Sequence, residues 1–189
     1  MSMDLDVILK TLSQPTDDQN PRESELFVEM EKEIEKLSSL SASALPNWQR
    51  IEKIGSEYLT QQSKDFLVAS WVAEAWTQCY ALQGVSAGLG LMEGLATQYW
   101  EQAIPPINRL RGRRNAILWW IERLTDWLEK QTEITLNQEL SSTIISRARN
   151  FDSVLSNKDS EAPSFFKLIS LLERIPVEAS GNPQEMPLA

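Results

Sequence analysis

The sequence predicts an all-α protein, a multi-helix globular bundle of layered antiparallel helices with no sheet. Apolar residues recur at helical spacing along most of the chain, and no segment shows the apolar–polar alternation of a half-buried strand. The chain has 189 residues, which suits one domain with a substantial core. Three consecutive helices between residues 63 and 130 would share an apolar core and form a helical layer.

The N-terminal region predicts a short helix over residues 4–12, followed by a loop. Asn20, Pro21 and Glu23 are then typical of the N-cap, the first position and the third position of a helix. This second helix is acidic and is expected to bury a single stripe on one face. The stripe consists of Phe27, Met30, Ile34 and Leu37.

A loop rich in serine and alanine occupies residues 38–46 and separates the acidic helix from the next one. Asn47 is expected to cap this next helix, which should end near Gln62. Its core-facing residues are Trp48, Ile51, Tyr58 and Leu59.

The segment from residue 63 to residue 82 predicts a helix that is apolar over most of its circumference and is therefore packed on several sides. Ser63 is the expected N-cap, because its hydroxyl can accept a hydrogen bond from an amide of the first turn. Gly84 is the expected end of the helix. The polar stripe is narrow and consists of Ser70, Glu74, Thr77 and Gln78.

The next predicted helix, at residues 85–100, contains Gly88, Gly90 and Gly94. Each glycine inside a helix costs about 1 kcal/mol relative to alanine, so three of them indicate close approach of a neighbouring backbone. The preceding helix is the expected neighbour, in a tight antiparallel hairpin. The double proline at 105–106 is expected to end the helix, because proline lacks an amide hydrogen.

Three further helical stripes complete the pattern. A helix is expected over residues 113–130, another over 136–155 and a last short one over 165–175. The final residues, 177–189, have no periodicity and are rich in linker residues, so they are expected to begin an interdomain linker. The predicted organisation is therefore a short helix and loop at 1–19, a helical domain at 20–176 and a linker to a further C-terminal region.

Composition excludes several kinds of function. The net charge is −9, which disfavours general attraction to nucleic acid or to an anionic membrane. The chain has no histidine, the commonest general base and transition-metal ligand, and its single cysteine, Cys79, cannot form an intramolecular disulfide. No apolar segment approaches the roughly 20 residues needed to cross a bilayer. We therefore expect a soluble cytoplasmic protein without cofactor or metal.

Four arginines, Arg109, Arg111, Arg113 and Arg114, lie just before and at the start of the helix predicted at 113–130. Cations at a helix N-terminus oppose the macrodipole, so an acidic partner is expected for them. One interpretation is intramolecular pairing, for example with the acidic residues between 29 and 35. The other is a docking patch for another protein. A nucleic-acid site is disfavoured, because one arginine cluster on an acidic domain is a weak footprint.

Trp119 and Trp120 are adjacent, so one can face the core while the other points away from it. Tryptophan is enriched in binding hot spots, and an exposed one would be a natural contact. Burial of both beneath another helix explains the pair equally well. The candidate partner-binding residues are therefore Arg109, Arg111, Arg113, Arg114 and Trp119.

Several motifs, in order and with their spacing, resemble the ImpA-N domain found at the start of TssA-type proteins of the bacterial type VI secretion system. The segments include NPRESELFVEMEKEIEKL, SKDFLVASWVAEAW and RLRGRRNAILWWIERL. The resemblance covers the chain from Asn20 to about Trp127. The motif positions are Asn20 and Pro21, Asn47 and Trp48, Ser63 to Asp65 with Trp71, Gly84 to Leu95, Tyr99 and Trp100, Pro105 and Pro106, and Asn115 and Ala116.

This resemblance implies an all-helical, non-enzymatic component of the cytoplasmic secretion machinery. It implies a role in baseplate assembly and in tail tube and sheath polymerisation, or in sheath capping, with protein partners from the apparatus. It implies neither nucleic-acid binding nor direct membrane insertion. The full-length protein would form a homo-oligomer through the further C-terminal region. The family supplies no catalytic residues, so the five candidate contacts remain an inference from the sequence.

Two other interpretations stay open. An enzyme would need a pocket with convergent carboxylates of perturbed pKa, since the chain lacks histidine and phosphate-binding motifs. A generic helical adaptor would bind a partner helix in an apolar groove. An exposed apolar groove, rather than a charged patch, would favour the adaptor.

Overall fold

The computed structural model describes residues 3–10, 20–40 and 44–179. These residues form eight α-helices and two short 3₁₀ helices, and among them there is no strand. The predicted all-α class is therefore confirmed. The helices are α1 (Leu5–Ile8), η1 (Pro21–Glu23), α2 (Glu25–Glu35), α3 (Trp48–Gln61), α4 (Phe66–Tyr80), α5 (Leu82–Gln98), η2 (Ile107–Arg109), α6 (Leu110–Glu129), α7 (Gln138–Lys158) and α8 (Phe166–Arg174).

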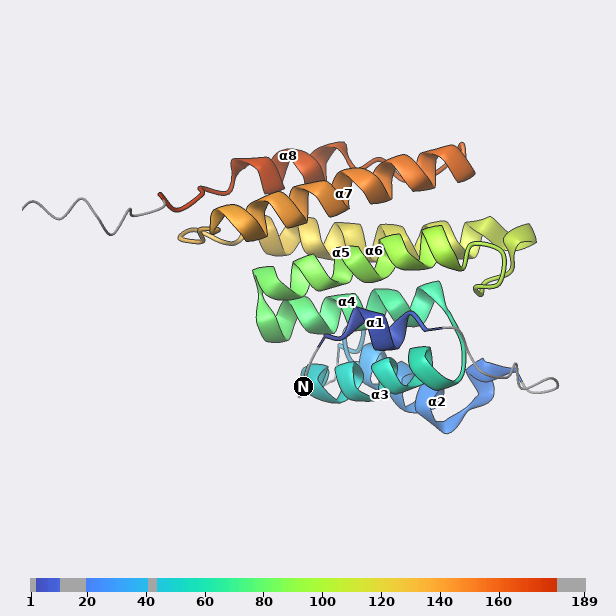
Figure 1. The fold of residues 1–189 in the computed structure, drawn as a ribbon. Helices are drawn as coiled ribbons and strands as arrows, with labels where there is room; N and C mark the ends of the chain where they lie inside the picture. Colours follow the sequence, from blue (N-terminus) through green and yellow to red (C-terminus); the bar gives the residue numbers. More distant parts are fainter. Residues whose placement is uncertain (1–2, 11–19, 41–43, 180–189) are drawn as a thin grey trace, which may run out of the picture.

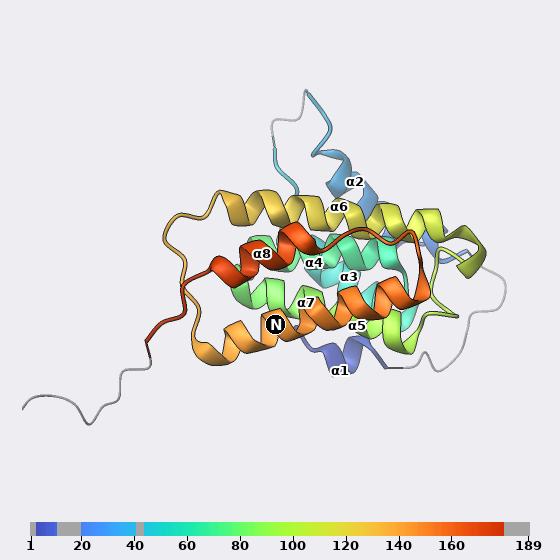
Figure 2. The ribbon, with the colours of Figure 1, turned by 90° about the horizontal axis from the view of Figure 1, so that it is seen from above.

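The helices stack in layers (Figure 1). α7 and α8 form one outer face, α5 and α6 lie beneath them, and α2 and α3 form the opposite face with α4 between. α8 contacts both α6 and α7, and the view onto this face shows it lying across them (Figure 2). α1 packs against α3 and α5. Ile8 of α1 is buried, so the N-terminal helix shares the core of the domain predicted to begin at residue 20.

α4 is the central helix and packs against α3, α5 and α6. Its side chains are buried on almost every face, as its apolar sequence predicts. Asp65, not Ser63, is its N-cap, and the Asp65 carboxylate accepts hydrogen bonds from the amides of Leu67 and Val68. The prediction of Ser63 as the cap is wrong, because the chain is still extended at Asp65.

A single residue, Ala81, joins α4 to α5, with φ of 51°. Positive φ is uncommon for a residue with a side chain. Gly84 therefore does not end α4 as predicted, but lies in the first turn of α5. A methyl group at Gly84 would overlap the backbone carbonyl of Trp76. Gly84 thus permits the close approach of the two helices at the tip of the hairpin.

The other α5 glycines face different neighbours. A Cβ at Gly88 would lie 2.8 Å from the Trp120 ring of α6 and 3.0 Å from the Cβ of Ala73 in α4, so this glycine faces the preceding helix, as predicted, and α6 as well. A Cβ at Gly90 would instead lie 2.6 Å from Leu5, and one at Gly94 would overlap Leu9. The prediction that all three face the preceding helix is therefore wrong for two of them, which receive the N-terminal segment.

α5 ends at Gln98, before the double proline at 105–106, so the prediction that the prolines end this helix is wrong. The prolines lie in the connection to α6. α6 begins at Leu110, before the predicted start at Arg113, because η2 leads directly into it.

Polar side chains cap the first helices. Asp4 caps α1, and the predicted cap of α3 by Asn47 is confirmed. Asn20 caps the 3₁₀ turn η1, while Ser24 caps the acidic helix α2. The prediction that Asn20 caps the acidic helix is therefore wrong, because the chain makes a separate turn first. The helix predicted at 4–12 is shorter in the structure, since α1 ends at Ile8 with Leu9 as its C-cap; residues 11 and 12 lie outside the described residues.

α7 and α8 follow the predicted stripes, and the segments before α7 and after α8 pair with each other. The Leu136 amide donates to the Pro176 carbonyl at 2.9 Å, and the Glu178 amide donates to the Leu136 carbonyl at 2.7 Å. Val177 and Glu178, assigned to the linker by the sequence, are thus attached to the helical body. The rest of the predicted linker, from residue 180, lies outside the described residues.

Candidate functional site

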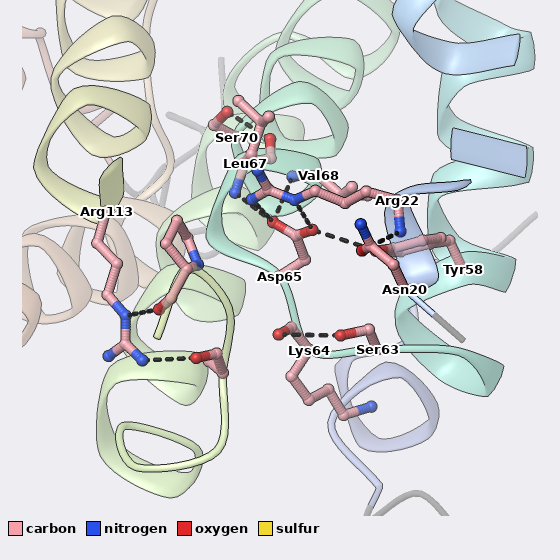
Figure 3. A network of polar contacts seen from close by, with 12 residues as sticks. Asn20, Arg22, Tyr58, Ser63, Lys64, Asp65, Leu67, Val68, Ser70 and Arg113 are labelled. Atoms are coloured by element: carbon pink, nitrogen blue, oxygen red, sulfur yellow. Dashed lines mark hydrogen bonds and ion pairs between the residues drawn. The ribbon is translucent and has the colours of Figure 1, made fainter. Parts of the chain in front are cut away.

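Asp65 is the centre of a buried polar cluster at the N-terminus of α4 (Figure 3). Its carboxylate accepts two hydrogen bonds from the Arg22 guanidinium, at 3.0 and 2.9 Å, and one from the Tyr58 hydroxyl at 3.1 Å. It also accepts the amides of Leu67 and Val68. Burial, together with the Asp65 carboxylate, raises the pKa of the Tyr58 hydroxyl, which therefore stays a donor. The cluster joins η1, α3 and α4.

Lys64 is a second buried charge, 4% exposed, beside Asp65. Its ammonium donates to the backbone carbonyls of Ile8 and Leu59, at 2.5 and 2.6 Å, and lies 5.4 Å from the centre of the Tyr99 ring. Burial lowers the pKa of Lys64 to about 8. Because both carbonyls lie at or near the ends of helices, Lys64 links the C-terminal ends of α1 and α3.

Arg113 is also buried, and its guanidinium is directed at the loop between α5 and η2 (Figure 3). It donates to the carbonyls of Trp100 at 2.7 Å, Ala103 at 2.6 Å and Pro105 at 2.6 Å. It also stacks on the rings of Trp100 and Phe66. Arg113 is 1% exposed, so its predicted place in a partner-facing patch is wrong. It stabilises the α5–η2 loop from within.

Arg114 has partners inside the molecule. It makes two hydrogen bonds to the Asp159 carboxylate, at 2.7 and 2.6 Å, and an ion pair with Glu161 at 2.9 Å. Arg114 holds the pKa of the Asp159 carboxyl below its usual range. The sequence proposed pairing with the acidic helix, but α2 uses Glu29 to pair with Arg50 of α3. The acidic partners of Arg114 lie after α7 instead.

Arg109 and Arg111 remain exposed at the start of α6. Neither forms an ion pair with another residue in the described ranges. No side chain caps the N-terminus of α6. Two cations therefore stand at the positive end of a helix without a neutralising neighbour, which is unfavourable for the isolated domain.

The two adjacent tryptophans of α6 have different environments. Trp120 is fully buried, whereas Trp119 is partly exposed. The Arg123 guanidinium lies 5.3 Å from the centre of the Trp119 ring and 5.8 Å from that of Trp48. Arg123 also forms an ion pair with the buried Glu74 at 3.0 Å. The Trp119 side chain is thus supported from one side by a fixed charged group.

A groove of about 460 Å³ lies between η1, α4 and α6, and Trp119 forms part of its wall. Trp71 and Leu67 of α4 line it together with Ala116 of α6, so its lining is mainly apolar. Arg111 precedes the groove residue Asn115 by one helical turn and therefore stands at its edge. The lining residues are Arg22, Leu67, Trp71, Pro105, Gly112, Asn115, Ala116 and Trp119.

The sequence did not predict this groove, because it assigned Trp71 to the core and gave Leu67 and Arg22 no role in binding. A signal was nevertheless present. Trp71, Pro105 and Asn115 all belong to the motifs of the family resemblance, although they are distant in the sequence. Their convergence on one groove becomes visible only when α4 and α6 are packed together.

Other kinds of site can be tested against the described residues. There, histidine, cysteine, aspartate and glutamate side chains do not gather in a group that could hold a metal ion. Nor does any described helix combine the length and apolar character that a membrane span needs. The class of the protein follows from these contacts. It is an all-helical domain whose buried charges join its helices. Its surface has an apolar groove near two arginines that form no ion pair within the described part of the chain.

The chain belongs to the ImpA N-terminal family of the type VI secretion system, which it matches over residues 15–122. This confirms the resemblance found from the sequence motifs. The matched range contains the Asp65 cluster, Lys64, Arg113 and the groove.

The fold is similar to a solved structure, the N-terminal domain including the conserved ImpA_N region of the TssA component of the type VI secretion system from Burkholderia cenocepacia. The TM-score is 0.69 at 16% identity, over 92% of this chain and 90% of that one. At this identity the similarity supports the helical fold. A comparison with curated proteins gave no match.

Proposed function

We propose that this chain is the N-terminal interaction domain of a TssA-like protein that assembles the contractile tail of the bacterial type VI secretion system. It acts in the cytoplasm, in baseplate assembly and in tail tube and sheath polymerisation or sheath capping. The proposal includes the homo-oligomer that the resemblance implies for the full-length protein. The observation that carries it is the family match over residues 15–122.

The geometry supports an interaction role for this domain. Asp65, Lys64 and Arg113 use their charges to hold helix ends and a loop in place. They leave a fixed surface around the groove, with Arg109, Arg111 and Trp119 accessible to a partner. We therefore retain these three residues as the proposed contacts and remove Arg113 from the set, while Arg114 is engaged with Asp159.

A second candidate function is a generic helical adaptor that binds a partner helix. The apolar lining of the α4–α6 groove favours it, because helix recognition uses an apolar groove. The two functions differ in their consequence for the cell. An assembly domain is required for the secretion tail to form, whereas a generic adaptor is not.

The proposal is tested by deleting the codons for residues 20–179 from the chromosomal gene and imaging a fluorescent sheath subunit in living cells. We expect few or no sheaths, with recovery when the intact gene is supplied. Sheaths that start at normal frequency but reach abnormal lengths would assign the domain to capping. Normal sheath number and length, with the shortened protein present on an immunoblot, would overturn the proposal.

A further inference from the structure

We infer that the start of α6 and the α4–α6 groove together bind an acidic segment of a partner protein, which places one large apolar side chain in the groove. The inference rests on the proposed function and adds the chemistry of the partner. It joins two features near the start of α6. The first is the cations Arg109, at the end of η2, and Arg111, neither of which forms an ion pair with another described residue. The second is the groove, whose wall includes Trp119.

The charge of the partner follows from the arginines. Four arginines stand between residues 109 and 114, in a chain whose net charge is −9. Arg113 is satisfied by three carbonyls, and Arg114 by Asp159 and Glu161. Arg109 and Arg111 have no such partner among the described residues, although an acidic protein has many carboxylates to offer.

Both cations also oppose the dipole of α6, whose N-terminus lacks a side-chain cap. A carboxylate from outside would reverse both effects, because it pairs with the arginines and favours the positive end of the helix. Charge complementarity therefore selects an acidic partner at this place.

The apolar part of the partner follows from the groove. Its volume of about 460 Å³ lies within the range of about 300–1,000 Å³ typical of ligand sites. Trp71 and Leu67 face it from α4, and Trp119 and Ala116 face it from α6. Arg123 fixes the Trp119 ring, so little side-chain freedom is lost on binding. A rigid, partly exposed tryptophan beside such a groove is typical of a binding hot spot.

The probe is an array of overlapping short peptides that cover the baseplate, sheath and tube proteins of the same secretion system. The full-length protein is applied to the array, and the affinity of each bound peptide is measured in solution. We expect the bound peptides to carry net negative charge and a leucine, phenylalanine or other large apolar residue. Peptides from residues 20–37 and 177–189 of this chain and a labelled DNA strand are included.

Arg111→Glu is the decisive variant, and Lys130→Glu is its matched control. Both residues are exposed and both substitutions change the net charge equally, but Lys130 is the C-cap at the opposite end of α6. We expect Arg111→Glu to weaken peptide binding about tenfold or more while its thermal midpoint stays at or above that of the wild type. Lys130→Glu should leave binding unchanged.

One further variant and one altered peptide separate the contribution of charge from that of apolar packing. Trp119→Ala should also weaken binding about tenfold or more, and its helix content is checked by circular dichroism. A peptide whose glutamates are replaced by lysines should bind Arg111→Glu better than the wild type.

The inference is overturned if the bound peptides are neutral or basic, if no acidic peptide binds, or if Arg111→Glu binds as the wild type does. Preferential binding of the chain's own peptides or of DNA would also overturn it, because the occupant would then be of another kind. Imaging of sheaths distinguishes this failure from failure of the proposed function. If deletion of the domain abolishes sheaths while Arg109→Glu/Arg111→Glu cells form them normally, the assembly role stands and the docking surface does not.

Discussion

Arg22 and Asp65, which are 43 residues apart in the sequence, form a two-point ion pair at the N-terminus of α4. The guanidinium Nε lies 3.0 Å from one carboxylate oxygen and Nη2 lies 2.9 Å from the other. Arg22 directly follows the Asn20-Pro21 turn, and Asp65 ends the Ser-Lys-Asp segment. In this chain the pair thus joins two segments that are distant in the sequence, and Arg22 supplies the cation that compensates the buried Asp65 carboxylate.

Asp65→Asn tests the energetic role of this pair. Asparagine can still cap α4, but it loses the charge that binds Arg22 and one acceptor for Tyr58. Removing one partner of a buried pair leaves the other uncompensated, and we expect a loss of about 2–4 kcal/mol in the free energy of unfolding. Urea unfolding followed by circular dichroism measures it. Arg22→Met should cost at least as much, because it leaves the fully buried Asp65 carboxylate without its counter-ion, whereas Asp65→Asn leaves Arg22, whose side chain is 30% exposed to water. A loss below about 1 kcal/mol for Asp65→Asn would contradict the prediction.

The packing of α5 predicts that two glycine-to-alanine substitutions in this helix destabilise the protein by very different amounts. At Gly84 the new methyl group would overlap the backbone carbonyl of Trp76, so α4 and α5 must separate. At Gly90 it would meet the ends of two long side chains, Leu5 at 2.6 Å and the Arg147 guanidinium at 3.0 Å, which can move more easily than a backbone carbonyl. We expect Gly84→Ala to cost about 3 kcal/mol or more and Gly90→Ala about 1 kcal/mol or less. Thermal unfolding of both proteins, compared with the wild type, is the measurement, and equal costs would contradict the predicted geometry.

Local pattern was sufficient for the helical class, for the apolar stripes of α3 to α8 and for the Asn47 cap, because these depend on residues that are close in the sequence. The stripe predicted for α2 is wrong at Leu37, which is exposed because α2 ends at Glu35. It was insufficient where two local choices are equally good. Ser63 and Asp65 are both favourable caps, and the choice depends on Arg22 and Tyr58, which approach only in the folded chain. Gly84 is typical of a helix end, but Ala81 makes the turn.

The candidate site shows the same limit. Arg111 and Arg113 are only two residues apart in the sequence, yet Arg111 is exposed and Arg113 is buried. The reason is that side chains two positions apart on a helix point in directions that differ by about 200°. The carbonyls that receive Arg113 belong to an irregular loop that no periodicity describes. The sequence located the arginine cluster at the start of α6 but could not separate its structural arginines from its accessible ones.

Lys64 predicts a pH dependence of stability. Burial lowers the pKa of Lys64 to about 8, from 10.5 for an exposed lysine. Between these values the unfolded chain keeps the proton that the folded chain has released. The unfolded state thus binds more protons, and the contribution of Lys64 to the free energy of unfolding rises with pH in this window. Below it both states are protonated and the contribution is constant.

The measurement is the difference in the free energy of unfolding between the wild type and Lys64→Met, from about pH 7 to about pH 10.5. We expect this difference to increase across the window in favour of the wild type. Taking the difference removes the effect of Tyr58, which is present in both proteins. Lys53→Met, at an exposed position of α3, is the control and should give a constant difference. A constant or decreasing difference for Lys64 would refute the prediction.

Arg113→Lys tests whether the shape of the side chain, rather than its charge, stabilises the α5–η2 loop. The planar guanidinium reaches three carbonyls in different directions while it stacks on Trp100 and Phe66. A lysine ammonium keeps the charge but cannot reproduce this fork, so buried carbonyls lose their donors. We expect a loss of about 2–4 kcal/mol in the free energy of unfolding and faster amide hydrogen exchange at residues 99–104. Arg111→Lys, at an exposed position of the same helix, should change neither. Equal effects of the two substitutions would contradict the prediction and show that a positive charge alone is sufficient at this position.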